Sequence, residues 1–164
     1  MYIGFWSALG FHGFIEQVPR SVHVATTKWL PDRTIHDVEY YFITLAEWKF
    51  FGHEQYSVSG HSVPIASPEK TPADCANLPS HCGGVRELAK GIRAEIDGYN
   101  PETLLEYATR IGNGAALKRL VYLMDHYGIP VLDREAVTAH FTAGTSPLDP
   151  TRSATGTYAP EYRL

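Results

Sequence analysis

The sequence has few cysteines, no long hydrophobic run and no surplus of basic residues. Cys75 and Cys82 are its only cysteines, too few for a disulfide scaffold, and a reducing compartment would keep both as thiols. No apolar run approaches the roughly 20 residues that a transmembrane helix needs. Met1 is not followed by the basic and then apolar region of a secretory signal. We therefore expect a cytoplasmic protein that does not enter the membrane.

The charge balance argues against a domain that grips nucleic acid by itself. The formal net charge is −4 and the isoelectric point is near 6.0. Affinity for duplex DNA comes largely from neutralising phosphates, so a DNA-binding domain usually carries a basic surplus. We expect no tight duplex binding by this chain.

The hydrophobic pattern predicts a mixed fold with a helical second half. A chain of 164 residues that is 44% hydrophobic can bury one core. A helix is expected over residues 2–13, and β-rich segments follow at residues 22–26 and 38–45. A hairpin is expected around Ser59-Gly60, because glycine tolerates the positive φ of a tight turn. The predicted class is α+β, with a small, mainly antiparallel sheet packed against a helical layer.

Three amphipathic helices are expected in the second half. Their apolar stripes occupy residues 85–96, 101–111 and 117–127. Asn100-Pro101 is a strong start signal for the second of these helices, and Gly112 is its stop. Residues 142–164 are rich in Thr, Ser, Gly and Pro. We therefore expect a single domain over residues 1–141 and an irregular C-terminal arm or tail over residues 142–164.

Residues 63–75 predict a strand that runs directly into a capped helix. Val63 and Ile65 alternate as in a half-buried strand, and Ser67 offers a hydroxyl to the free N–H groups of a first helical turn. Ser67 and Lys70 also have the nucleophile-and-base spacing of penicillin-binding enzymes. Those enzymes require Ser-Asp-Asn and Lys-Thr-Gly elements as well, and neither tripeptide occurs here. We interpret the segment as a helix start.

The same segment resembles part of the C-terminal domain of AbiEi-type antitoxins, which are predicted transcriptional regulators of viral-defence toxin–antitoxin operons. Other segments match that family in order and spacing, and the resemblance runs from about Tyr2 to Gly128. These segments are residues 2–14, with Ser7-Ala8-Leu9 and His12-Gly13; residues 16–26; Phe50-Phe51-Gly52; and residues 83–88.

The resemblance implies a non-catalytic antitoxin or regulatory domain of a type IV toxin–antitoxin system, which acts in abortive infection and phage defence without a cofactor. Such an antitoxin is paired with a nucleotidyltransferase-like toxin and need not neutralise it through a stable complex. Family members carry a winged-helix module before the opening helix, whereas Met1 directly precedes that helix here. We therefore expect DNA binding only where a separate winged-helix module is supplied. The oligomeric state is left open.

Pro72 departs from the family, which usually has an aliphatic residue at this position. Counted from Ser67 as the cap, Pro72 lacks the N–H that would bond back to Pro68. Two alternatives follow. Either the helix begins at Pro72 with Thr71 as its cap, or its first turn is distorted.

An alternative function is a metal-dependent nuclease. Pro31-Asp32 followed by Glu47-Trp48-Lys49 matches a loose Pro-Asp…Glu-x-Lys pattern. In such a site Asp32 and Glu47 would hold a divalent ion and Lys49 would assist attack by water, because hard cations prefer oxygen ligands. The pattern is short and degenerate. We expect Asp32 in a turn, Glu47 exposed beyond a strand, and no convergence of the three side chains.

A zinc site is a weaker candidate. Its ligands would be Cys75, His81 and Cys82 with His53 or His61. The two cysteines do not have the usual spacing of structural zinc ligands, and a thiol on a helix packs well as a small apolar group. We expect neither a metal nor another cofactor.

Two further surfaces deserve testing against the structure. Arg86, Lys90 and Arg93 share one helix face and are the candidate nucleic-acid or phosphate-binding residues, although Glu87 dilutes their charge. The residues that would extend this basic stripe are Arg110, Lys118 and Arg119. Aromatic residues crowd a short region, and any that reach the surface would form a protein-interaction module, the third functional hypothesis. These aromatic residues are Tyr40, Tyr41, Phe42, Trp48, Phe50 and Phe51.

Overall fold

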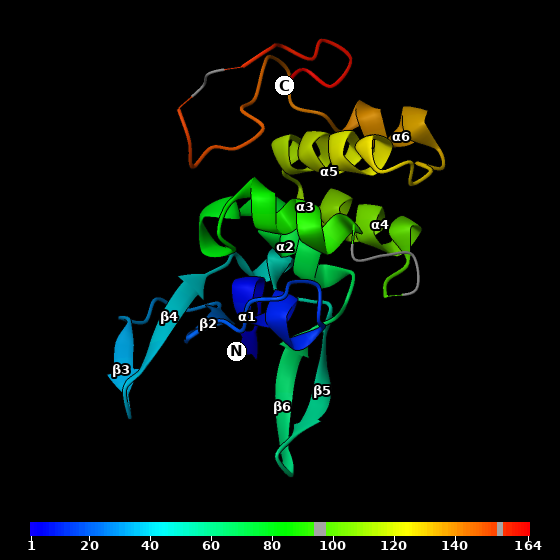
Figure 1. The fold of residues 1–164 in the computed structure, drawn as a ribbon. Helices are drawn as coiled ribbons and strands as arrows, with labels where there is room; N and C mark the ends of the chain where they lie inside the picture. Colours follow the sequence, from blue (N-terminus) through cyan, green and yellow to red (C-terminus); the bar gives the residue numbers. More distant parts are fainter. Residues whose placement is uncertain (94–97, 154–155) are drawn as a thin grey trace.

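A computed structural model describes residues 1–93, 98–153 and 156–164. Figure 1 shows a stack of helices above a sheet whose two ends project downward as separate wings. The last part of the predicted stripe at residues 85–96, including Ile96, lies outside the described residues.

The sheet contains six strands in the order β3-β4-β2-β1-β6-β5. The pairs β1·β2, β3·β4 and β5·β6 are antiparallel, whereas β1·β6 and β2·β4 are parallel. The predicted mainly antiparallel sheet is confirmed. The strands are β1 (Tyr2–Ile3), β2 (Ser21–Thr26), β3 (Arg33–Ile35), β4 (Val38–Thr44), β5 (His53–Val58) and β6 (His61–Ala66).

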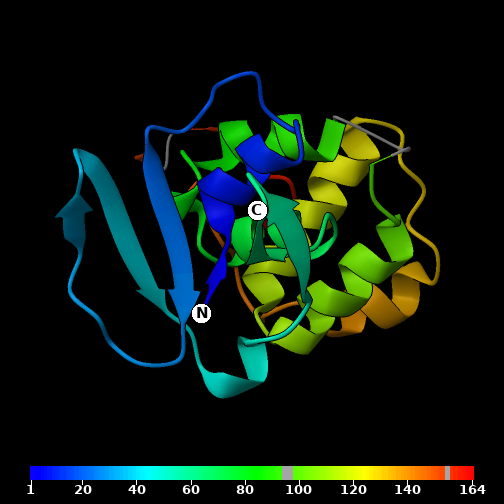
Figure 2. The ribbon, with the colours of Figure 1, turned by 90° about the horizontal axis from the view of Figure 1, so that it is seen from below.

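Helices supply the other layer, which confirms the α+β class. The α-helices are α1 (Phe5–Phe11), α2 (Lys70–Asn77), α3 (Val85–Arg93), α4 (Pro101–Ile111), α5 (Gly114–His126) and α6 (Arg134–Ala139), and the short 3₁₀ helices are η1 (Glu47–Lys49) and η2 (Pro79–His81). Seen from below in Figure 2, strands β2, β4 and β3 lie on the side of the molecule away from α4 and α6. Within the described ranges, no helix has the length and apolarity needed to cross a bilayer.

Several expected boundaries follow from local chemistry. Asn100 caps α4 with its side-chain oxygen, which accepts hydrogen bonds from the backbone N–H groups of Glu102 and Thr103 at 2.9 and 3.1 Å. Gly112 ends the same helix with φ of 74°. Ser59 and Gly60, with φ of 49° and 80°, form the tight turn between β5 and β6. These predictions are confirmed.

The start of the chain differs from the prediction of a helix over residues 2–13. Tyr2 and Ile3 form β1, and the helix begins only at Phe5. β1 pairs with β2 on one side and β6 on the other, so Ile3 lies opposite both Val24 and Ile65. Two residues are too few to display strand alternation, which is why the sequence pattern missed a strand inside the sheet.

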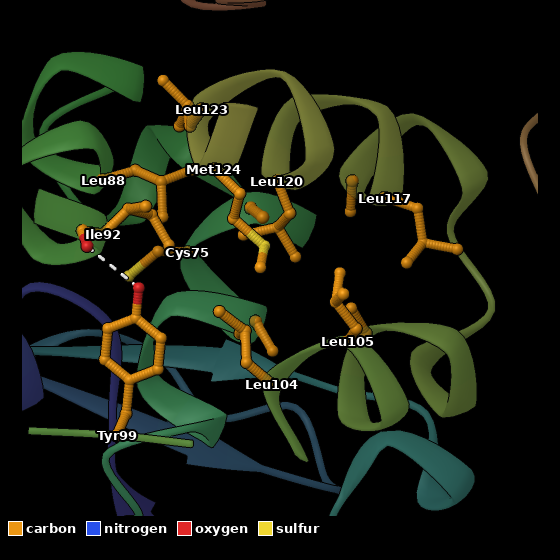
Figure 3. Packing of buried hydrophobic residues seen from close by; sticks show 14 of the residues in the cluster. Cys75, Leu88, Ile92, Tyr99, Leu104, Leu105, Leu117, Leu120, Leu123 and Met124 are labelled. Carbon is orange, nitrogen blue, oxygen red and sulfur yellow. Dashed lines mark hydrogen bonds between the residues drawn. The ribbon is translucent and has the colours of Figure 1, made fainter. Parts of the chain in front are cut away.

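α2 is the central helix of the fold. All eight of its residues are buried, and α1, α3, α4 and α5 surround it. The larger hydrophobic cluster lies between α2 and the helices of the second half, and Figure 3 shows Cys75 of α2 facing Leu88, Leu120 and Met124. The smaller cluster joins α1 to the sheet. The middle of the chain therefore connects both cores.

The chain after α6 forms no further helix or strand within the described residues and lies over α5 (Figure 1). Lys118 donates to the carbonyl oxygen of Gly144 at 2.6 Å and to Ser146 Oγ at 3.2 Å. Arg119 donates to the carbonyl oxygen of Leu148 at 3.0 Å. Two cations of α5 thus satisfy carbonyl groups of this irregular segment.

Candidate functional site

A buried polar cluster joins the first strand to the central helix. Lys70 and Asp74 lie four residues apart on α2 and form an ion pair, and both side chains are 0% exposed. The hydroxyl of Tyr2 donates to Asp74 Oδ2 at 2.8 Å and accepts from Lys70 Nζ at 3.2 Å. The ammonium group also lies over the ring of Phe51, 4.7 Å from its centroid. Every polar group of this Tyr2–Lys70–Asp74 cluster has a partner.

The loop before the hairpin closes over this cluster. Gly52 has φ of 67°, and a Cβ added there would lie 3.1 Å from Cβ of Lys70. Its carbonyl oxygen accepts from the N–H of Ser67 at 2.8 Å. Only glycine combines this left-handed conformation with such close packing on a neighbouring side chain. The loop therefore excludes water from the lysine.

Burial and charge act in opposite directions on the ion pair. Burial lowers the pKa of Lys70, and the charge of Asp74 raises it again. Burial likewise raises the pKa of Asp74, whereas the Lys70 charge lowers it. The pKa of Tyr2 is raised by burial and by the neighbouring Asp74 carboxylate, so its hydroxyl stays protonated and acts as a donor. The cluster is suited to holding β1 against α2, since Lys70 and Asp74 are closed off from a substrate.

Ser67 closes the turn that leads into α2, whose N-cap position is Glu69, and does not form a catalytic pair with Lys70. Its hydroxyl accepts from the backbone N–H of Lys70 at 3.2 Å, whereas the Lys70 ammonium points to Asp74 and Tyr2. Val63 and Ile65 lie on β6, as predicted. The helix begins at Lys70, so Pro72 is its third residue. The first four N–H groups of a helix have no partner within it, so proline is tolerated there.

The three candidate nuclease residues lie at different places in the fold. Asp32 Oδ1 accepts from the N–H of Phe42 at 2.9 Å, which holds the start of β3 to β4. Glu47 is exposed in η1, beyond the end of β4. Lys49 donates to Asn77 Oδ1 at 3.3 Å, at the end of α2. The predicted exposure of Glu47 is confirmed. The predicted turn at Asp32 is wrong, because its carboxylate binds the backbone of a neighbouring strand in place of its own turn.

The two cysteines among the zinc candidates have structural roles in the core. Cys75 and Cys82 are free and buried, and Cys82 Sγ donates to the carbonyl oxygen of Pro79 at 3.3 Å. Burial raises the pKa of Cys75, which keeps the thiol protonated. In the part of the chain that the structure describes, no three His, Cys, Asp or Glu side chains gather as a metal site.

The basic stripe on α3 is only partly available to a phosphate. Arg86 and Arg93 are exposed. The ammonium of Lys90 lies between them along the helix and bonds both carboxylate oxygens of Glu87, at 2.8 and 3.0 Å. One of the three charges is therefore neutralised within the helix.

The proposed extension of the stripe is wrong. Lys118 is 0% and Arg119 is 5% exposed, because both hold the C-terminal segment through its carbonyl groups. Arg110, on α4, is exposed. Its guanidinium stacks on the Phe51 ring, 3.8 Å from the ring centroid. Sequence reasoning treated Lys118 and Arg119 as solvated, because nothing local to α5 reveals what packs on it.

The aromatic region divides between core and surface. Phe51 is buried, and Phe50 packs on Tyr2 with ring centroids 5.0 Å apart. Trp48 is 65% exposed, and Trp29, which the sequence analysis did not single out, is 77% exposed. Two tryptophans at the surface keep a protein-interaction role open for this part of the chain.

His23 is a buried ionisable residue that the sequence analysis missed. It lies on β2, is 6% exposed, and its ring is tilted against those of Tyr41 and Trp6, whose centroids are 5.2 and 6.2 Å away. Its Nδ1 atom has no hydrogen-bond partner within the described residues. Burial lowers the pKa of His23 to about 4, with a further lowering from His81 and an opposing effect of Asp32.

We expect His23 to make the protein sensitive to acid. Its pKa in the folded state lies below its ordinary value of 6.5, so the unfolded chain binds more protons as the pH falls from 6.5 towards 4. The shift corresponds to about 3 kcal/mol, which is the expected loss of stability between pH 7 and pH 4. Urea unfolding at pH 7 and pH 4 measures it. His23→Phe should remove this share of the pH dependence, and an unchanged dependence would contradict the assignment.

Comparison with known proteins supports the fold. No protein-family model and no curated protein matches the chain. Among solved structures, the crystal structure of the RV2827C protein from Mycobacterium tuberculosis is similar, with a TM-score of 0.68 and 20% sequence identity. The alignment covers 99% of this chain and 61% of that chain, so this chain spans less than two thirds of that protein. At this identity the comparison shows a shared fold.

Proposed function

We propose that this chain is the antitoxin or regulatory domain of a type IV toxin–antitoxin system, acting without catalysis and paired functionally with a nucleotidyltransferase-like toxin. The observation that carries the proposal is the AbiEi-like series of segments. Several of them meet at one place: Tyr2, Gly52, Ser67, Lys70 and Asp74 come from three of those segments and contact one another. A set of motifs that builds one structural junction is more specific than the same motifs scattered over a surface.

Co-expression tests the proposal. The chain should restore growth of a bacterial host that expresses the nucleotidyltransferase-like toxin encoded next to its gene. Asp32→Asn/Glu47→Gln should protect equally well, because asparagine keeps an oxygen for the Phe42 N–H and Glu47 is exposed.

The outcomes separate the hypotheses. Protection lost in the folded Asp32→Asn/Glu47→Gln variant, together with magnesium- or manganese-dependent cleavage of nucleic acid by the unchanged chain, would favour the nuclease. No protection by a chain that is expressed and folded, or no such toxin gene beside it, would contradict the antitoxin role.

The isolated chain should not bind duplex DNA tightly. Its net charge is −4, and Lys90 in the only basic stripe we identified is paired with Glu87, so few phosphates can be neutralised. A gel-shift titration against its own promoter at physiological salt should show no sub-micromolar, sequence-dependent binding. Arg86→Ala/Arg93→Ala serves as the control: any binding that these substitutions abolish would assign the stripe to nucleic acid.

A further inference from the structure

A groove of about 550 Å³ lies between α4 and α6. Its floor contains the apolar side chains of Leu105 and Val137, and the loop before α6 contributes Leu132. Leu132 is 58% exposed, so an apolar side chain lies open to solvent beside the floor. The residues of α4 that line the groove run from Glu102 to Arg110, a length of roughly 12 Å, or two helical turns.

The rim of this α4–α6 groove is acidic. Glu102 and Glu106 lie one turn apart on α4, both exposed, and neither forms an ion pair within the described residues. Asp133 faces them at the start of α6, where its carboxylate accepts from the N–H of Ala136 at 3.4 Å. The one guanidinium at the rim, Arg110, is stacked on Phe51. The charge at the rim is therefore mainly negative, above an apolar floor.

We propose that the α4–α6 groove docks an amphipathic helix of a partner protein, with the apolar face of that helix on the floor and lysine or arginine side chains at its flanks. A groove about two turns long with an apolar floor fits anchors spaced i, i+3, i+4 and i+7. Paired acidic residues on the rim select basic flanks and reject acidic ones. The same charges disfavour duplex DNA. This inference is independent of the antitoxin role.

Fluorescence anisotropy with synthetic peptides tests the groove. The probe is a labelled peptide of about 14 residues with leucine at the four anchor spacings and lysine on the flanks; its matched control has glutamate in place of lysine. The lysine peptide should bind with micromolar affinity and the glutamate peptide at least tenfold more weakly. Binding of the lysine peptide should also weaken as salt rises.

Substitutions locate the binding on the protein. Glu102→Lys/Glu106→Lys should weaken binding about tenfold. Ala136→Gln, at an exposed groove position, should weaken it by occupying the depression without adding charge. The matched control Glu16→Lys/Glu161→Lys makes the same charge change at exposed positions elsewhere and should leave affinity nearly unchanged. Circular dichroism of each variant checks the fold.

Three results would overturn the proposal. The first is that Glu102→Lys/Glu106→Lys and the control Glu16→Lys/Glu161→Lys weaken binding of the lysine peptide equally. That result would indicate only general attraction between opposite charges. The second is equal binding of the glutamate peptide. The third is no measurable binding of the lysine peptide to the folded protein.

Discussion

Replacing Lys70 by methionine should lower the free energy of unfolding by about 3–5 kcal/mol, the usual cost of removing one partner from a buried ion pair. Lys70 and Asp74 are both 0% exposed, and methionine keeps most of the aliphatic volume. The Asp74 carboxylate would be left with Tyr2 as its neighbour on that side. Urea unfolding followed by tryptophan fluorescence gives the value.

A triple replacement distinguishes charge from packing. Tyr2→Phe/Lys70→Met/Asp74→Leu removes every polar group of the cluster and should recover most of the stability lost in Lys70→Met, because a well-packed apolar replacement of a buried ion pair is often neutral. A loss below about 1 kcal/mol in Lys70→Met would contradict the burial of the pair. The cluster would then be a solvated ion pair.

Gly114→Ala should destabilise the protein by about 2–3 kcal/mol, although local rules predict the opposite. Gly114 is the first residue of α5, and alanine favours a helix by about 1 kcal/mol over glycine. A Cβ at Gly114, however, would collide with the backbone nitrogen of Thr142 and lie 2.5 Å from the carbonyl oxygen of His140. Backbone atoms cannot rotate away, so the segment after α6 must shift.

The control for this prediction is Gly128→Ala. Gly128 has φ of 71° and no atom within 4 Å of an added Cβ, so only the left-handed conformation is penalised, by about 1 kcal/mol. Thermal unfolding should rank Gly114→Ala as the more damaging change. Faster limited proteolysis near residue 142 should accompany it. A stabilised Gly114→Ala protein would show that the segment does not pack on α5 as described.

Much of the fold could be predicted from short-range patterns. The cap at Asn100, the hairpin turn at Ser59 and the junction from β6 through Ser67 into α2 were all correct. In each case the donor and acceptor, or the residue that tolerates a special φ, lie within a few positions of one another. The α+β class followed because strand and helix periodicities differ over a window of that size.

The candidate sites were less predictable. Asp32, Glu47 and Lys49 match a catalytic pattern in sequence, yet the structure engages Asp32 with β4 and Lys49 with α2. The short edge strand β3 was missed, since its turn uses His36 and Asp37 at positive φ in place of glycine. A sequence motif gives the order of side chains along the chain. A site also requires that these side chains lie close together in space, which depends on strand pairing between distant segments.

The sequence by itself determined the start and stop of α4, the tight turn between β5 and β6, and the absence of a basic surplus. Only the tertiary structure decided which charges are buried. Lys70, Lys118 and Arg119 look like ordinary helix-surface cations, but a glycine loop covers the first and the C-terminal segment covers the other two. Likewise, Glu102 and Glu106 line a groove only because α6 lies opposite them. Burial depends on which distant segment packs against a residue, and local sequence does not contain that information.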